Sequence, residues 1–324
     1  MKKIFSNPVS KGADPSVTFH DGYYYFLRSE FYDVGDSGTR ESLLVSKAKN
    51  LYEIGTAPAV TVYKPDPGHP WSKELWSPKL YFLDGVWYLY HAADDGQNKN
   101  HRDYVLRAKT DDPQGEYEMI GKICDPATDK WAIGPHILEY KGKRYFMWTG
   151  WEGDENVEQH LYIAEMENPW SLKPGKGRVS FCRPTEEWEK HGSGNGYPTV
   201  VEGATALIGP KGKVHVIYSA SGCWTDDYCL GMLTLKPDAD PLVAENWVKH
   251  PEPVFRKTDK VFGPGHAFFT TSPDGKEDWM VYHATLHAGD NWGKRCIFCQ
   301  RFTWDENDDP VFGEPKLQEE WNYE

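Results

Sequence analysis

Two acidic residues in separate parts of the chain are placed to do acid–base chemistry. Asp14 stands before Pro15 and Glu202 stands before Gly203, each at the start of a similar strand–turn–strand segment. Two carboxylates that flank a scissile bond can act as a base that activates water and an acid that protonates the leaving oxygen. Taken singly, Asp14 could be a turn residue and Glu202 a surface acid. Their equivalent positions in separate segments favour a catalytic role.

These segments are copies of one repeat. Asp14, Ser77 and Gly134 are each followed eight positions later by a glycine, and each copy reads as a strand, a turn and an aromatic strand. A third strand and a short fourth strand trail each hairpin. Two looser copies follow later in the chain, so that the five copies begin at Asp14, Ser77, Gly134, Glu202 and Pro264.

The repeat predicts an all-β fold, a five-bladed β-propeller with four antiparallel strands in each blade. A β-sandwich would also have regular strands and turns, but it would not return the same hairpin five times. No linker or shift in composition interrupts the chain, so we predict a single domain over residues 1–324. Because the first strand of each blade lines the central channel, the five starting residues should converge on the propeller axis.

The composition favours an uncharged ligand rich in hydroxyl groups. The 324 residues carry a formal net charge of −13 and include 14 Trp and 19 Tyr. The negative charge argues against nucleic acid, and aromatic rings can pack on the apolar faces of sugars, although most aromatics of a β protein belong to its core. We therefore expect a carbohydrate partner and no nucleic-acid partner. The sequence leaves the oligomeric state open.

The N-terminal region has no apolar stretch of the length of a signal-peptide core, and no run of about 18 apolar residues that could span a membrane occurs anywhere. These features predict a cytoplasmic protein without membrane association. Secretion is the alternative if the sequence is a trimmed form of a longer one. The six cysteines are expected to be reduced, with a disulfide between Cys223 and Cys229 as an option in an exported protein.

Motifs along the whole chain resemble glycoside hydrolase family 43, particularly its arabinofuranosidase-like branch. Asp-Gly-x-Tyr-Tyr alone would be weak evidence for this family, but the motifs are specific when taken together. They are Ala13-Asp14-Pro15, His20-Asp21-Gly22-Tyr23-Tyr24, Leu75-Trp76-Ser77-Pro78, Trp131-Ala132-Ile133, Gly150-Trp151-Glu152-Gly153, Glu202-Gly203, Ser219-Ala220-Ser221-Gly222 with Asp227-Tyr228-Cys229-Leu230-Gly231, and Gly263-Pro264-Gly265-His266. The resemblance implies a five-bladed propeller, in agreement with the repeat count.

The resemblance also implies an inverting mechanism with Asp14 as the general base and Glu202 as the general acid. A second Asp of the family, which tunes the pKa of the acid, has no counterpart, because Gly134 follows Ile133 where relatives resemble Trp-Ala-Ile-Asp. Losing that negative charge should lower the pKa of Glu202 and leave less of it protonated near neutral pH. We therefore expect weak activity with an acid-shifted optimum, unless His136 or Asp129 takes over the role.

Several further residues are expected near the substrate. Trp76, Trp148 and Trp151 could wall a sugar subsite, although at least one of them should be plain packing. His101 and Arg295 resemble family residues near the substrate, and His266 resembles a family histidine that contacts a metal or an ordered water. The alternatives are a solvated loop for His101, a surface cation for Arg295 and a core histidine for His266. We expect no required cofactor, with a structural calcium near the propeller axis as an option. The expected substrate-binding residues are Trp76, His101, Gly134, His136, Trp148, Trp151, His266 and Arg295.

The function predicted from the sequence is an exo-acting α-L-arabinofuranosidase that acts on arabinose-containing plant polysaccharides or oligosaccharides. A β-xylosidase or another glycosidase of the same family is one alternative. A glycan-binding propeller with weak or lost catalysis is the other, because Gly134 replaces the acid that tunes Glu202. An inverting reaction also predicts that the carboxyl groups of Asp14 and Glu202 lie about 6.5–9.5 Å apart, with room for a water.

Overall fold

The computed structural model describes residues 3–32, 39–125 and 127–323, and its regular structure consists of β-strands and 3-10 turns of three residues. Blades 1 and 2 are separate four-stranded antiparallel sheets. Blade 1 contains β3 (Ser16–His20), β4 (Tyr23–Tyr32), β5 (Thr39–Ala48) and β6 (Ala59–Tyr63). Blade 2 contains β7 (Lys73–Leu83), β8 (Val86–Asp94), β9 (Arg102–Ala108) and β10 (Tyr117–Ile123).

Blades 3 and 4 join into one nine-stranded sheet, because the ends of β13 and β16 form a short parallel pair. Blade 3 contains β11 (Ala132–Tyr140), β12 (Lys143–Trp151), β13 (Glu158–Asn168), β14 (Ser171–Leu172) and β15 (Val179–Cys182). Blade 4 contains β16 (Thr199–Ile208), β17 (Val214–Ala220), β18 (Cys229–Leu235) and β19 (Trp247–Lys249).

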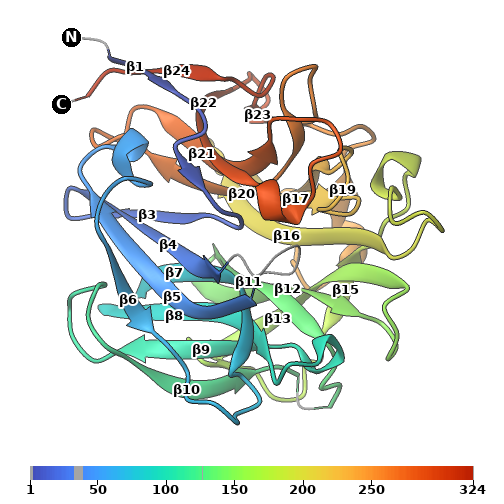
Figure 1. Ribbon diagram of the computed structural model, residues 1–324. Helices are drawn as coiled ribbons and strands as arrows, with labels where there is room; N and C mark the ends of the chain where they lie inside the picture. Colours follow the sequence, from blue (N-terminus) through green and yellow to red (C-terminus); the bar gives the residue numbers. More distant parts are fainter. Residues whose placement is uncertain (1–2, 33–38, 126, 324) are drawn as a thin grey trace.

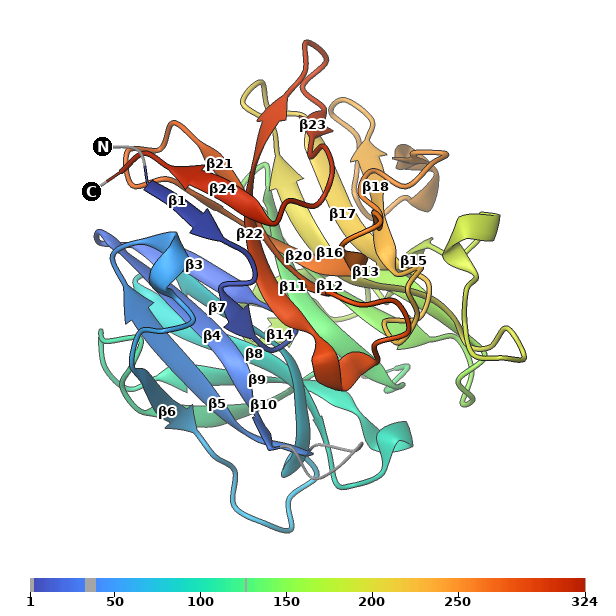
Figure 2. The same cartoon turned by 45° about the horizontal axis from the view of Figure 1, so that its top comes forward.

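Blade 5 closes the ring with strands from both ends of the chain (Figure 1). Its inner strands are β20 (Phe262–Thr271), β21 (Asp278–Thr285) and β22 (Cys296–Trp304), and β22 is flanked by β2 (Ser10–Lys11) and β23 (Pro310–Val311). The repeat analysis expected the outer strand to follow in sequence, whereas part of it comes from the N-terminus. β1 (Lys3–Ser6) pairs with β24 (Gln318–Trp321), which brings the two termini together (Figure 2).

Most strands are buried on both faces, because each blade packs between two neighbours. All seven residues of β17 are buried, for example. Trp87, Trp279 and Trp321 are among the largest fully buried side chains. Burying one large apolar side chain stabilises a fold by about 1.5–3 kcal/mol, so the apolar side chains packed between blades stabilise the propeller strongly. The five-bladed, all-β prediction is confirmed.

The first strand of each blade shares a backbone feature that aligns the repeats. One residue near its start has a positive φ, a region that glycine and, less readily, Asp or Asn adopt. In blades 2 to 5 a break in the strand register coincides with this residue. The five residues are Asp14 (φ 53°), Ser77 (48°), Gly134 (70°), Gly203 (59°) and His266 (53°). The starts assigned from sequence in blades 4 and 5 are therefore displaced: Glu202 lies one residue before the equivalent position, and Pro264 lies two residues before it.

Candidate active site

Asp14 lies in a buried ring of cationic and imidazole groups. Its side chain is only 9% exposed, and Arg40 Nη1 lies 3.4 Å from its Oδ2. Its Oδ1 lies 3.5 Å from His266 Nδ1 and 3.6 Å from Arg295 Nη1. The backbone N–H of Asp14 donates to His283 Nδ1 at 3.1 Å. The site therefore holds this carboxylate through groups from blades 1 and 5.

The environment keeps Asp14 ionised. Burial alone would raise its pKa, because the charged form loses hydration. The neighbouring His266, His283, Arg295 and Arg40 outweigh burial and hold the pKa of Asp14 well below its usual value. At neutral pH this carboxylate is therefore available to accept a proton.

Glu202, on β16, is held in the opposite protonation state. It is buried, and Tyr228 Oη donates a hydrogen bond to its Oε1 at 2.7 Å. Burial raises the pKa of Glu202 to about 7; Asp14 adds to the rise, whereas Tyr228 and Arg295 oppose it. The carboxyl is thus largely protonated below neutral pH. Burial therefore raises this pKa without an acid at position 134, and the expected effect of the missing acid stays a prediction.

His266 contacts Asp14 and packs on the backbone next to Glu202. Its Nδ1 lies 3.5 Å from Asp14, and a Cβ built on Gly203, the residue after Glu202, would lie 3.0 Å from the same nitrogen. The imidazole therefore packs on the backbone beside Glu202 while it faces Asp14. The structure brings together Asp14, Glu202, His266 and Arg295 of the residues expected from sequence.

We predict that Gly203→Ala sharply lowers kcat/KM, because the new methyl group forces the His266 imidazole or β16 to shift. Gly212→Ala is the matched control, since Gly212 also has a positive φ (88°) but a Cβ there meets nothing within 4 Å. Alanine in this backbone region costs about 1–2 kcal/mol at both positions. The thermal unfolding temperature should fall by a similar amount in both variants, whereas kcat/KM should fall only in Gly203→Ala. Equal activities would contradict the packing role of Gly203.

Gly134 leaves space beside Glu202. A Cβ built on it would lie 3.5 Å from Thr149 Oγ1 and 3.7 Å from the backbone nitrogen of Gly203, which are ordinary contact distances. Thr149 Oγ1 is buried without a hydrogen-bond partner among the described residues. A short acceptor at position 134 would therefore fit.

The two residues considered as substitutes for the missing acid are engaged elsewhere. His136 is buried, and its Nδ1 lies 2.6 Å from Tyr81 Oη. Asp129 forms an ion pair with Arg102, 2.6 Å between Oδ1 and Nε, and contacts Lys122. Neither residue has an interaction with Glu202 among the described residues, so neither replaces an acid at position 134.

An aromatic group lies next to the start of the first strand of blade 2. Trp76 stacks on His101 with ring centroids 4.0 Å apart, and Trp131 stacks on Trp151 at 4.6 Å. His101 is buried, and its Nδ1 lies 3.0 Å from Asp94 Oδ2. Trp76 is half-buried, whereas Trp151 is buried. Trp76 can therefore face a ligand while it stacks on His101 and packs against the buried cluster that contains Trp151.

Trp148 is not part of this group. It is 5% exposed and belongs to the core between blades 2 and 3, where it stacks with Phe146 and Tyr162 at centroid distances of 5.6 and 5.7 Å. The prediction that Trp148 walls a sugar subsite is wrong, because its strand turns this side chain into the gap between blades.

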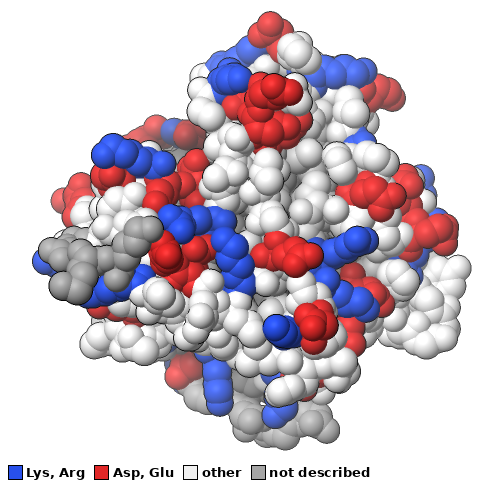
Figure 3. Space-filling model, turned by 90° about the horizontal axis from the view of Figure 1, so that it is seen from above, with Lys and Arg blue, Asp and Glu red and all other residues white. Residues whose placement is uncertain are grey.

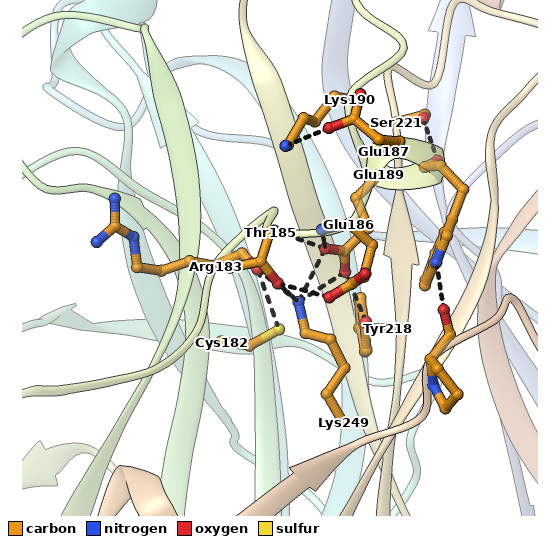
Figure 4. A network of polar contacts seen from close by, with 12 residues as sticks. Cys182, Arg183, Thr185, Glu186, Glu187, Glu189, Lys190, Tyr218, Ser221 and Lys249 are labelled. Carbon is orange, nitrogen blue, oxygen red and sulfur yellow. Dashed lines mark hydrogen bonds and ion pairs between the residues drawn. The ribbon is translucent and has the colours of Figure 1, made fainter.

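A polar network anchors the segment that precedes β16. Glu189, fully buried, accepts hydrogen bonds from Tyr218 Oη at 2.7 Å and from Lys249 Nζ at 2.8 and 2.9 Å (Figure 4). Ser221 Oγ donates to the carbonyl of Trp188 at 2.9 Å. These contacts tie a 3-10 turn to the end of β17, where the loop toward β18 begins. All six cysteines, including the two on this loop and strand, are free.

Four residues of the site were not predicted from the sequence. Tyr228 belongs to a motif that resembles the family, but nothing in its spacing assigned it to Glu202. His283 and Arg40 lie on second and third strands, where the repeat gave no reason to expect site residues. Lys79 was missed although a lysine between apolar strand residues is a signal of an unusual environment. The four residues are Arg40, Lys79, Tyr228 and His283.

The residues around His266 do not fit a metal ion. Its Nε2 lies 3.3 Å from Lys79 Nζ, a cation that would repel another. Across residues 3–32, 39–125 and 127–323, no group of three or more His, Cys, Asp or Glu could hold a metal. Calcium elsewhere near the axis stays a prediction.

Charges of both signs are interspersed on the face seen from above in Figure 3, where basic side chains do not form a continuous stripe. None of the described helices is long and apolar enough to cross a membrane.

Comparison with known proteins identifies close similarity to arabinose-releasing enzymes. An extracellular exo-α-(1→5)-L-arabinofuranosidase of Streptomyces avermitilis is 34% identical over 96% of this chain and 63% of its own length. An enzyme of the same name from Streptomyces chartreusis is 32% identical over 86% of this chain and 82% of its own length. The chain thus spans less than two thirds of the first relative.

The relatives also correct one prediction. A cytoplasmic location was expected because no leader segment is visible in the sequence. That expectation is wrong on this comparison, since both Streptomyces relatives are named extracellular enzymes and point to secretion.

The fold matches a solved enzyme over nearly its full length. A crystal structure of an α-L-arabinofuranosidase from Lactobacillus brevis superposes with a TM-score of 0.86 at 31% identity and covers 99% of this chain and 98% of that one. The family model described as glycosyl hydrolases family 43 matches residues 5–310. With the two buried carboxylates in place, the chain belongs to glycosyl hydrolase family 43.

Proposed function

We propose that the protein is an inverting, exo-acting α-L-arabinofuranosidase. The observation that carries the proposal is the contrast between the surroundings of two buried carboxyl groups: the cations and imidazoles around Asp14 hold its pKa well below its usual value, and burial raises the pKa of Glu202 to about 7. Between these values one group accepts a proton while the other donates one, as acid–base catalysis at neutral pH requires.

In the proposed reaction Asp14 takes a proton from water as the water oxygen attacks the anomeric carbon. Glu202 gives its proton to the glycosidic oxygen, and the bond between the anomeric carbon and that oxygen breaks. Attack from the face opposite the leaving group inverts the anomeric configuration. Exchange with solvent then returns the proton to Glu202 and removes it from Asp14. This mechanism requires a spacing of about 6.5–9.5 Å between the two carboxyl groups, so that a water fits between Asp14 and the sugar.

The sugar and the mode of attack are proposed from the similar proteins. The relatives that are 30–34% identical over most of this chain have names that specify L-arabinofuranosyl residues, and the two Streptomyces names also specify exo attack. A solved xylan β-1,4-xylosidase shares only 14% identity, which carries the fold alone. Trp76, half-buried beside the channel, could stack on a furanose ring.

The test is a panel of 4-nitrophenyl glycosides, with sugar binding measured in parallel by calorimetry. We expect nitrophenol release from α-L-arabinofuranoside to exceed release from β-D-xylopyranoside. Faster release from the xyloside would favour the β-xylosidase alternative. Binding of arabinosides without release from any substrate would favour a glycan-binding propeller and overturn the proposal.

We predict that Gly134→Asp raises activity on the alkaline side of the pH profile. The new carboxylate would lie next to Glu202 and raise its pKa above about 7; each pKa unit corresponds to about 1.4 kcal/mol between protonation states. Asp is tolerated at this φ, as Asp14 shows at the equivalent position, and Thr149 can donate to it. Because the acid acts when protonated, the alkaline limb of kcat/KM should move to higher pH.

Gly142→Asp is the control for this variant, since Gly142 has a similar φ of 72° on an exposed turn with nothing within 4 Å of a built Cβ. Its pH profile should match that of the native protein. An alkaline limb that stays in place or moves to lower pH in Gly134→Asp would contradict the assignment of Glu202 as the acid.

A further inference from the structure

A buried lysine contacts His266, the histidine that faces the proposed base. Lys79, on β7 of blade 2, is 1% exposed, and its Nζ lies 3.3 Å from His266 Nε2. The ammonium also lies 5.7 Å from the centre of the Phe268 ring. No carboxylate lies within ion-pair distance of Lys79 among the residues described. Lysine is almost never fully buried unless it is paired, so this arrangement requires a reason.

A second, partly buried lysine of the same chain shows the usual pairing. Lys249 lies 2.8 Å from the carboxylate of Glu189 and contacts both of its oxygens. Lys79 has an imidazole in place of a carboxylate, and burial lowers its pKa to about 8. It is still mostly an ammonium at neutral pH, and the cost of burying it is not offset by a full counter-charge.

The contact determines where His266 carries its proton. An ammonium has only donors, so Lys79 donates and His266 Nε2 accepts. A neutral imidazole that accepts at Nε2 carries its hydrogen on Nδ1. Burial lowers the pKa of His266 well below its usual value, which keeps the ring neutral. Nδ1 is the nitrogen that lies 3.5 Å from Asp14 Oδ1.

His266 is held in position through both its backbone and its ring. The backbone N–H of His266 donates to Ser219 Oγ at 2.7 Å, and the residue keeps a positive φ of 53°. The imidazole packs against Gly203. Non-glycine residues in this backbone region are often found where function requires a fixed geometry. Lys79 contributes the remaining contact, at the end of the ring remote from Asp14.

We propose that Lys79 is a positioning residue, whose ammonium holds His266 in the Nδ1–H form that donates toward Asp14 and occupies the place beside His266 where the resemblance allows a metal or an ordered water. The inference rests on the proposed role of Asp14 as the base. It makes the chain's own ammonium the positive charge next to His266, and turnover should need no added metal.

The first test measures the proton position directly. In the native protein labelled with ¹⁵N-histidine, two-bond proton–nitrogen spectra should show His266 with a pyrrole-type Nδ1 and a pyridine-type Nε2; the His266→Gln spectrum identifies the signal. In Lys79→Met, which keeps the side-chain volume, the Nε2–H form should appear. A native ring in the Nε2–H form, or the same form in both proteins, would overturn the inference whether or not the protein hydrolyses glycosides.

The second test separates kcat from KM. Lys79→Met should lower kcat by about 10- to 100-fold, as is typical when the group that orients a functional imidazole is lost, and change KM little. Lys213→Met is the control, because Lys213 forms an ion pair with Asp309 at the start of β17 and is only partly exposed. Its kinetics should be unchanged. If Lys79→Met does not fold, the test uses Lys79→Ala with added propylammonium instead.

Propylammonium supplies the missing carbons and charge, whereas 1-propanol has the same size without the charge. Recovery of kcat with the amine only supports the inference, and equal recovery with both compounds would reduce Lys79 to a filler of space. Native activity should also survive chelation with EDTA. Activity that is lost with EDTA and restored by calcium would contradict the inference and leave the proposed hydrolase function intact. Absence of hydrolysis with an intact Nδ1–H form would contradict the proposed hydrolase function and leave the inference about Lys79 and His266 intact.

Discussion

Asp14→Asn should lower kcat by about 100- to 10,000-fold on every glycoside, activated or not, because the attacking water loses the group that removes its proton. Asparagine has nearly the same shape and tolerates the positive φ of 53°. Its backbone N–H keeps the hydrogen bond to His283. The variant should therefore fold and bind arabinose like the native protein, and the loss should appear in kcat.

The matched control is Asp21→Asn. Asp21 also has a positive φ (47°) and stands on the same blade, but its side chain is 86% exposed in the first hairpin turn. This control should keep native activity. If Asp14→Asn retained more than about a tenth of native kcat, the role of Asp14 as a base worth at least 100-fold would be rejected.

Glu202→Gln should distinguish substrates by their leaving groups. Glutamine keeps the shape and can still contact Tyr228 but has no proton to give. Arabinan oligosaccharides, whose leaving oxygen needs a proton, should lose about 100- to 10,000-fold in kcat. 2,4-Dinitrophenyl arabinofuranoside, which departs as a stable anion, should lose far less. Equal losses on both substrates would contradict the role of Glu202 as the acid.

Glu202→Gln should also change how activity depends on pH. In the native protein the acid form of Glu202 is present below its pKa of about 7, so activity on oligosaccharides should fall as the pH rises through that value. The low pKa of Asp14 places the acidic limb well below it. In Glu202→Gln the alkaline limb near 7 should disappear. Glu118→Gln, which changes an exposed ion pair with Arg107, should keep both limbs.

The fold could be predicted from the sequence because the hairpin repeat is local. A glycine turn eight residues after each of the first three starts, followed by aromatic strands, is visible without tertiary information. The last blade was harder, since β2 pairs with β22 across almost the whole chain. The starts of blades 4 and 5 were displaced because Gly203 and His266, which hold the equivalent backbone conformation, are not followed by proline as Asp14, Ser77 and Gly134 are.

The site was predictable where a motif named a residue and not where packing decides. Asp14 and Glu202 stand in motifs, and the structure gathers them with His266 and Arg295. Trp148 was misassigned because sequence does not say which gap between blades a strand residue enters. The pKa of Glu202 depends mostly on burial, which the sequence does not show, so the missing acid at position 134 was not enough to predict it.

One measurement tests the central assignment most directly. Asp14→Gly suits the local backbone, because glycine readily adopts a φ of 53°, and it removes the base while leaving space for a small anion. Azide needs no deprotonation to attack. With 4-nitrophenyl α-L-arabinofuranoside and sodium azide, this variant should form β-L-arabinofuranosyl azide, the inverted product, as followed by proton NMR. Formation of the α-azide, or a folded variant that azide does not accelerate, would contradict Asp14 as the base of an inverting hydrolase.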